Sequence, residues 1–381
     1  MASIYIHIPY CRQACYYCNF HFSTFLKTKS ELLSTIASEL VLRKDYLGDE
    51  KIKTIYFGGG TPSLLETSEI KNILETIYQN YDVESDGLEI TLEGNPDDLT
   101  YPKLQDFFKA GINRLSIGVQ SFHDHDLKLL NRVHNAGQSK KCLEDAKQAG
   151  FENITIDLIY GIQEQTDEQW IDNLEQLKTF NLPHFSAYSL TIEPKTALEK
   201  MIRKGEVENT DDDQSASQFI LLQNWAEQNK YIPYEISNYC LPGHFSRHNT
   251  GYWTGEKYLG IGPSAHSFNG ISRQWNIANN NLYIKNINQG DSYFEIEHLS
   301  NITRYNEYVM TSLRTVWGCD LNVIKERFGL QFANAIMKSA AYYVSENLLF
   351  VKDDVIRLTL AGKLLADKII SELFVLNSSE I

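Results

Sequence analysis

Short runs of β-branched and aromatic residues alternate with amphipathic segments over the first half of the chain. Residues 30–47, 68–81, 138–149 and 168–180 carry apolar residues three and four positions apart, as helices packed on one face do. The strand candidates between them are residues 3–8, 53–57, 87–92, 113–119, 153–159 and 184–190. Six successive βα units predict an α/β fold with a parallel sheet, either open or curled into a partial barrel. Its ligand site is expected at the carboxyl ends of the strands.

The pattern changes in the second half of the chain. Residues 211–228 predict a long helix with three aspartates at its positive N-terminal end. Residues 231–270 are rich in Gly, Pro, His and aromatic residues, which favours a structured site loop over a linker. We therefore divide the chain into a barrel of residues 1–230, a site region of residues 231–300 and a C-terminal domain of residues 301–381.

The C-terminal domain reads as three helices, a hairpin and a last helix. Residues 344–350 and 355–359 are the predicted strands of the hairpin, and residues 360–373 are the predicted last helix. This order resembles a small winged-helix domain. Its acidic and basic residues are equal in number, so it lacks the positive surface that a DNA-reading wing needs.

Composition and charge exclude several classes of protein. The 381 residues are 43% hydrophobic and 22% charged, which is typical of a folded globular protein and not of a disordered one. No apolar run is long enough for a transmembrane helix, and no signal peptide is recognisable, so we expect a cytoplasmic protein. A net charge of −14 argues against a general nucleic-acid binder.

Three of the six cysteines form the strongest chemical signal. Cys11, Cys15 and Cys18 follow the first predicted strand in a C-x3-C-x2-C spacing. Three thiolates on one loop can hold three irons of a [4Fe–4S] cluster, which leaves the fourth iron open to the amino and carboxylate groups of S-adenosylmethionine (SAM). The alternative is a structural zinc ion with His7 or His21 as the fourth ligand.

The sequence around these cysteines resembles radical SAM enzymes, in particular the oxygen-independent coproporphyrinogen III oxidase family. The resemblance covers essentially the whole chain. It is carried by Tyr5-Ile-His-Ile-Pro-Tyr-Cys11, Gly58-Gly-Gly-Thr-Pro62, Glu93-Gly-Asn-Pro96, Gly118-Val-Gln-Ser-Phe122, Asn131-Arg132 and Asp157-Leu-Ile-Tyr-Gly161. It implies a partial (β/α)6 TIM-like radical SAM barrel followed by a small helical, winged-helix-like domain.

Matching positions imply a SAM pocket at the ends of the strands. Gly59, Gly60 and Thr61 would contact the methionine part, although a plain turn capped by Thr61 with Pro62 at the first helical position explains the same residues. Arg132 can pair with a carboxylate, and Tyr17 can stack on adenine. The remaining residues that the resemblance places in this pocket are Tyr5, Glu93, Gln120, Asp157 and Thr191.

Two features separate this chain from the decarboxylating members of the family. Those members have a fourth cysteine where this chain has Phe20, and they carry an N-terminal extension before the motif that starts here at Tyr5. The string His248-Asn-Thr-Gly-Tyr252-Trp253 resembles the H-N-x-x-Y-W signature of the HemW subgroup of heme chaperones. His248 could ligate heme iron, and Tyr252 and Trp253 could pack on the macrocycle. His266 is a second candidate for heme or for the SAM pocket. A buried structural histidine is the other interpretation of His248.

Three hypotheses follow. The first is a heme-binding radical SAM protein that passes heme to an acceptor protein and needs a reductant for its cluster. The second is an oxidase that decarboxylates two propionates of coproporphyrinogen III to vinyl groups, since a passive carrier would hardly need a SAM site. The third, a radical enzyme acting on RNA, rests only on the wing-like C-terminus and is weakened by its neutral charge. The resemblance leaves open whether SAM chemistry is used.

Overall fold

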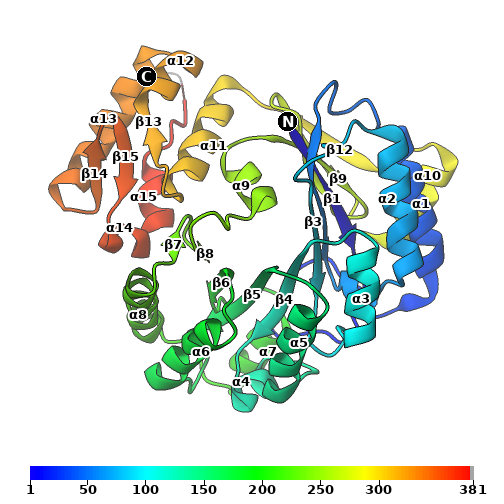
Figure 1. Cartoon of the computed structure of the whole chain (residues 1–381). Coiled ribbons are helices and arrows are strands. Elements are labelled where there is room, and N and C mark those ends of the chain that lie inside the picture. The colour runs from blue at the N-terminus through cyan, green and yellow to red at the C-terminus, as the bar shows by residue number, and fades with distance from the viewer. Residues whose placement is uncertain (378–381) are drawn as a thin grey trace.

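Six parallel strands form the centre of the molecule (Figure 1). The computed structural model describes residues 1–377. The strands pair in chain order, and every neighbouring pair is parallel, so the predicted α/β fold with a parallel sheet is confirmed. They are β1 (Ala2–Ile8), β2 (Ile52–Gly59), β3 (Glu89–Gly94), β4 (Arg114–Gln120), β5 (Asn153–Tyr160) and β6 (His184–Ser189).

Helices cover the outer face of this curved sheet (Figure 1). The connections between the strands contain η1 (Leu26–Thr28), α1 (Lys29–Leu42), η2 (Pro62–Leu64), α2 (Thr67–Asn80), α3 (Tyr101–Lys109), α4 (Asp124–Leu129), α5 (Ala136–Gln148) and α6 (Asp167–Thr179), and α7 (Ala197–Arg203) and α8 (Asp212–Gln228) follow β6. Asp211 caps α8, because its Oδ1 accepts hydrogen bonds from the backbone N–H groups of residues 213 and 214. The predicted helix 30–47 ends earlier, at Leu42, and is followed by turns.

The sheet continues beyond these six strands at both edges. At one edge β9 (Lys257–Ile261) pairs in parallel with β1, and β10 (His266–Phe268), β11 (Ser272–Asn276) and β12 (Phe294–His298) add antiparallel strands. At the other edge β8 (Asn238–Cys240) and β7 (Ile232–Pro233) pair antiparallel. Residues 231–270, predicted as a loop, therefore contain strands and α9 (Arg247–Trp253), and α10 (Asn280–Gln289) follows them.

A second hydrophobic core forms from residues 305–375. Its helices are α11 (Asn301–Leu313), α12 (Leu321–Arg327), α13 (Leu330–Ser345), α14 (Leu360–Leu364) and α15 (Ala366–Glu372). A small sheet in the order β13-β15-β14 completes it, with β13 (Cys319–Asp320), β14 (Leu349–Lys352) and β15 (Val355–Leu358). This agrees with the predicted C-terminal helical domain carrying a hairpin. The exact division of the chain at residues 230 and 300 stays a prediction.

The hairpin boundary was placed too early by the sequence pattern. The predicted strand 344–350 begins only at Leu349, because the apolar face of α13 continues through Tyr343 and the helix ends at Ser345. Asn347 then reverses the chain with φ of 56°. The predicted helix 360–373 is divided at Leu365, whose φ and ψ of −114° and 19° are not helical.

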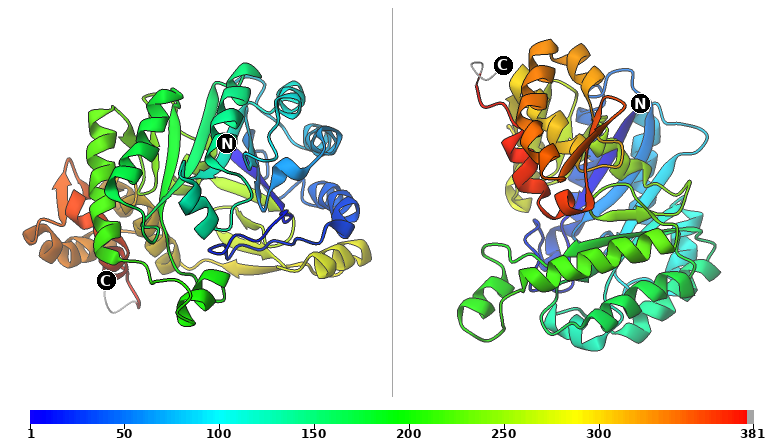
Figure 2. Two further views of the ribbon diagram at one scale, coloured as in Figure 1. Left: turned by 90° about the horizontal axis from the view of Figure 1, so that it is seen from below. Right: turned by 90° about the vertical axis from the view of Figure 1, so that its left-hand side faces the viewer.

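The C-terminal domain contacts both edges of the open sheet. On one side the backbone N–H of Val316 donates to the carbonyl of Tyr234, just before β8, at 2.9 Å. On the other side Glu307 of α11 pairs with Arg273 of β11 at 3.1 Å. Figure 2 shows this domain lying beside the barrel. None of the helices within residues 1–377 combines the length and apolarity that crossing a bilayer requires.

Candidate functional site

The three clustered cysteines lie on the loop after β1 and line one cavity of about 500 Å³. Their thiols are partly accessible, and none forms a disulfide. Thr61 Oγ1 lies 3.5 Å from Cys11 Sγ, and Arg132 Nη1 lies 3.2 Å from Cys15 Sγ. Burial raises the pKa of Cys11 to about 11, against the opposing effect of the Thr61 hydrogen bond. We call this space the cluster cavity.

The zinc alternative finds no support in the geometry of the two histidines. His7 uses both ring nitrogens, at 3.2 Å from Tyr5 Oη and 3.0 Å from the His21 carbonyl oxygen. His21 Nε2 lies 2.8 Å from Asn280 Oδ1. Within residues 1–377 no group of three His, Cys, Asp or Glu side chains is arranged to hold a single metal ion. A [4Fe–4S] cluster needs a different geometry, because each thiolate binds its own iron.

The glycines after β2 form a cradle beside the cysteines. Gly59 has φ of 106°, and a Cβ there would lie 2.5 Å from the His7 ring. A Cβ at Gly60 would lie 2.7 Å from the Tyr10 carbonyl oxygen. The side chain of Thr61 makes no capping hydrogen bond, so the prediction that Thr61 caps this turn was wrong. Pro62 does occupy the first position of η2, as predicted. The Thr61 hydroxyl instead accepts a hydrogen bond from Asn95 Nδ2 at 3.2 Å.

Arg132 is anchored at the wall of the cluster cavity. Besides Cys15, its guanidinium donates to Asn95 Oδ1 at 2.5 Å and to the Gly118 carbonyl at 2.8 Å. Its Nε is buried and has no hydrogen-bond partner within residues 1–377. Burial acts to lower the pKa of Arg132, but Tyr17 and Cys15 outweigh it and raise the pKa. A fixed cation with a spare buried donor suits the carboxylate of a bound ligand.

Two buried carboxylates, Glu93 and Asp157, line the cluster cavity. Glu93 at the end of β3 accepts hydrogen bonds from Tyr56 Oη at 2.7 Å and from the Gly59 N–H at 3.1 Å. Burial, with a smaller contribution from the nearby Asp157, raises the pKa of Glu93 to about 7. Burial also raises the pKa of Asp157, in β5, to about 6. These two side chains are suited to hold an amine or hydroxyls.

Three further predicted residues line the cluster cavity. Tyr17 lies between two of the cysteines, and burial raises its pKa. Gln120 ends β4 with φ of 66°, a left-handed conformation beside a break in the register of β4 and β5. Thr191 is exposed at the rim after β6. The structure therefore brings together all the predicted SAM-pocket residues except Tyr5 and His266.

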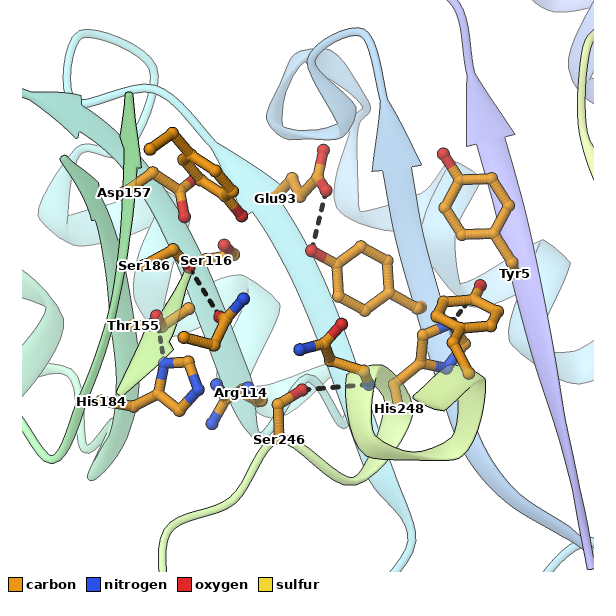
Figure 3. Close-up of a pocket in the computed structure, with 15 residues that line it drawn as sticks. Tyr5, Glu93, Arg114, Ser116, Thr155, Asp157, His184, Ser186, Ser246 and His248 are labelled. Atoms are coloured by element: carbon orange, nitrogen blue, oxygen red, sulfur yellow. Dashed lines mark hydrogen bonds between the residues drawn. The ribbon is translucent and has the colours of Figure 1, made fainter. Parts of the chain in front are cut away.

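Two more cavities adjoin the cluster cavity. The inner cavity, of about 230 Å³, lies inside the barrel (Figure 3). The outer cavity, of about 400 Å³, is lined by Tyr5, His7, Phe20, His21, Gly59, Glu93, Tyr252, Tyr258, Ser264 and His266. Glu93 lines all three cavities, and Tyr5 lines the inner and outer ones.

His248 lies deep in the inner cavity, where both of its ring nitrogens are hydrogen-bonded. Nδ1 is 2.7 Å from Thr54 Oγ1, and Nε2 is 2.9 Å from Tyr252 Oη. The ring stacks on Tyr56 at 4.8 Å and is 2% exposed. Burial lowers its pKa to about 3. In this arrangement His248 is a satisfied buried residue, and iron ligation by it requires at least one of these hydrogen bonds to break.

The other residues of the H-N-x-x-Y-W string differ in their surroundings. Tyr252 lines both the inner and the outer cavity. Trp253 is half-buried and lines none of the three cavities, and its buried Nε1 has no hydrogen-bond partner within residues 1–377. His266 is exposed on β10 and faces the outer cavity, while Phe20, 71% exposed, lines both the outer and the cluster cavity.

Several polar residues that point into the barrel were not predicted from the sequence. They alternate along each strand, as Ser116 does with the apolar Leu115 and Ile117. A period-2 search of the strands would have found them, because side chains in a strand alternate between its two faces. The missed residues are Tyr56, Arg114, Ser116, Thr155, His184, Ser186 and Tyr188.

Comparisons with known proteins agree with this geometry. The Radical SAM superfamily model matches residues 5–177, and the HemN C-terminal domain model matches residues 299–365. The chain is 32% identical over 372 residues to heme chaperone HemW of Bacillus subtilis (strain 168), which covers 97% of this chain and 98% of that one. Heme chaperone HemW of Escherichia coli (strain K12) is 36% identical over 267 residues, 69% of each chain.

A solved structure has the same fold. Coproporphyrinogen III oxidase (HemN) from Escherichia coli superposes with a TM-score of 0.85 over 98% of this chain and 90% of that one. The two sequences are 23% identical, so the match establishes the architecture and not the activity.

Proposed function

Because the chain belongs to the HemW-type radical SAM family, we propose that it is a heme chaperone. It holds a [4Fe–4S] cluster and SAM, binds heme and passes the heme to an acceptor protein. The near-full-length match to relatives named heme chaperone HemW carries this proposal. The polar and aromatic cavities at the strand ends support it.

Cys11, Cys15 and Cys18 are the ligands for the cluster in this proposal. They share one cavity, and three cysteines leave one iron without a protein ligand. A bound cluster supplies a low-potential electron, which an external reductant must replace. Arg132 donates a hydrogen bond to Cys15 Sγ, and the Thr61 hydroxyl donates one to Cys11 Sγ, so both sulfurs are oriented beside the cavity.

The residues around the cysteines suit SAM. Gly59 and Gly60 let the ligand approach the backbone closely, since a side chain there would fill the space. The unpartnered Nε of Arg132 is placed to bind a carboxylate. Glu93 in its ionised form can accept a hydrogen bond from the ligand's amino group, and Tyr17 offers a ring for adenine.

Heme is the cargo in this proposal, and the outer cavity is the space that suits it. Its volume of about 400 Å³ lies within the roughly 300–1,000 Å³ of small-molecule sites. Three tyrosines and Phe20 supply flat apolar surface. Phe20 stands where decarboxylases of the related family have a fourth cysteine, which separates this chain from them.

Heme titration into anaerobically reconstituted protein tests the proposal. We expect a saturable Soret band at one heme per chain, and transfer of that heme to apomyoglobin added as a heme scavenger. The titration is run with and without SAM. Heme binding that does not saturate at one heme per chain, or heme that never leaves the protein, would contradict a chaperone role.

The intact cluster cavity favours one second candidate, oxidative decarboxylation of coproporphyrinogen III. Product analysis tests this candidate, because substrate and product differ in mass and absorbance. The reconstituted, reduced protein is incubated with SAM and coproporphyrinogen III, and the porphyrins are separated. Formation of protoporphyrinogen would favour this candidate, and unchanged substrate beside an active control decarboxylase would remove it.

A further inference from the structure

The three histidines of the outer cavity differ in whether their ring nitrogens are free. His7 uses both nitrogens, and His21 is held through Nε2 by Asn280. Within residues 1–377, His266 has no hydrogen bond at either ring nitrogen, and its side chain is exposed. Partial burial and the nearby Arg273 lower the pKa of His266, so its imidazole is neutral at pH 7. The neutral ring is the form that ligates iron.

The backbone that carries His266 is held firmly. Gly262, which precedes it on the same loop, has φ of 101°, and a Cβ there would lie 2.5 Å from the His7 carbonyl oxygen. The buried carboxylate of Glu39 accepts hydrogen bonds from the Gly262 N–H at 2.8 Å and from Asn276 Nδ2 at 2.8 Å. A ligand on a fixed strand keeps its geometry better than one on a mobile loop.

An aromatic surface extends from the outer cavity along the edge strands. Tyr252 meets Tyr258 edge to face at 4.7 Å, and Tyr258 lies 6.1 Å from Phe268. His266 itself lies against Trp275, with ring centroids 6.3 Å apart and planes inclined by 30°. Flat apolar rings of this kind pack well on a macrocycle.

A cation lies beside this surface. The Arg273 guanidinium is 5.7 Å from the centre of the Phe268 ring and pairs with Glu307 through Nη2. Its Nε is buried without a hydrogen-bond partner within residues 1–377. A ligand with a flat apolar body and carboxylates at its edge matches both the rings and this donor.

We propose that His266 is the axial ligand of heme iron, with the macrocycle on the aromatic surface of β9, β10 and β11. This inference rests on the proposed function and names its binding site. His248, the histidine of the H-N-x-x-Y-W string, then acts indirectly: it fixes the hydroxyl of Tyr252, which lines the outer cavity. Phe20 and Glu93 line both the outer and the cluster cavity, so heme bound there is next to SAM.

Heme spectra of single variants test this assignment. Hemin is titrated anaerobically into the reconstituted full chain and into His266→Ala, His266→Gln, His21→Ala and His298→Ala. His298 is an exposed histidine of β12 and controls for nonspecific ligation. We expect His266→Ala and His266→Gln to bind heme at least about tenfold more weakly and to lose the imidazole-ligated spectrum. Added imidazole should restore that spectrum in His266→Ala, while His21→Ala and His298→Ala match the unmodified chain.

The outcomes separate this inference from the proposed function. If the unmodified chain does not bind heme, the proposed function fails first. If it binds heme and His266→Ala keeps the imidazole-ligated spectrum, only the assignment of His266 fails. A spectral loss that added imidazole does not reverse also overturns the assignment. SAM binding, measured on the same samples, shows that each variant is folded.

Discussion

The interior of the barrel is lined by polar side chains, whereas the core of the C-terminal domain is almost entirely apolar. Within residues 301–377, Ser312 and Thr315 are the buried polar residues, while the barrel buries histidines, carboxylates and Arg114 around its three cavities. A buried polar side chain needs a hydrogen-bond partner, and a ligand or water in a cavity can provide one. The polar lining therefore suits the barrel for ligands, whereas the C-terminal domain joins the edges of the open sheet.

Removal of a cluster ligand tests the ligand-binding role of the barrel and has the largest expected effect. We expect Cys15→Ala to abolish the cluster almost completely, because each iron bound by the protein needs its own thiolate. Iron and acid-labile sulfide are measured after anaerobic reconstitution. Cys142→Ala, which changes a buried cysteine of α5, is the matched control and should keep both. Full sulfide content in Cys15→Ala would contradict the ligand assignment.

A cavity introduced into the core of the C-terminal domain tests whether that domain contributes stability independently of the barrel. Ile369 is fully buried in α15, and Ile369→Ala should lower the free energy of unfolding by about 2–5 kcal/mol. Denaturant unfolding measures this loss. Leu360→Ala, at a 43% exposed site on α14, should change it by less than about 0.5 kcal/mol. Cluster content should be unchanged in folded Ile369→Ala, and a parallel loss would show that the two regions are not independent.

Arg132→Lys tests whether Arg132 contributes to SAM binding. Lysine lacks the planar fork that reaches Asn95, Gly118 and Cys15 together, so we expect SAM to bind about 10–100-fold more weakly. Equilibrium dialysis of SAM against the reconstituted protein measures the change. Arg12→Lys is the control, because Arg12 is exposed and pairs with Asp98 outside the cluster cavity. Equal effects of the two variants would argue against a specific role of Arg132.

The smallest expected effect is a pH dependence set by Glu93. The pKa of Glu93 is raised to about 7 by burial and by Asp157, so its carboxyl is neutral below that pH and ionised above it. An ionised carboxylate accepts hydrogen bonds from the amino group of SAM more strongly than a neutral carboxyl does, so SAM binding should weaken by about tenfold from pH 8 to pH 6. Glu93→Gln should remove most of this dependence. Glu193→Gln, at the same cavity, should keep it, and an unchanged pH profile in Glu93→Gln would exclude Glu93 as its origin.

Much of the fold could be predicted from the sequence because its signals are local. The apolar spacing placed α5 and α6 within two residues of their observed bounds. Gly150, with φ of 103°, follows the end of α5. The spacing of the cysteines likewise placed all three on one loop beside one cavity. The predicted strand start at residue 344 was wrong, and β14 begins at Leu349, because an apolar run of β-branched and aromatic residues fits a helix end as well as a strand.

The sequence by itself determined the order of the βα units and the cysteine loop, since both depend on neighbours within a few residues. The pairing of β9 with β1, which lie about 250 residues apart, is visible only in the tertiary structure. The same is true of the hydrogen bonds that Thr54 and Tyr252 make with the two ring nitrogens of His248. Strand pairing and burial depend on residues far apart in the chain. For that reason, the fold distinguishes the leading candidate histidine from the second one: His248 is satisfied and enclosed, and His266 is open to a ligand.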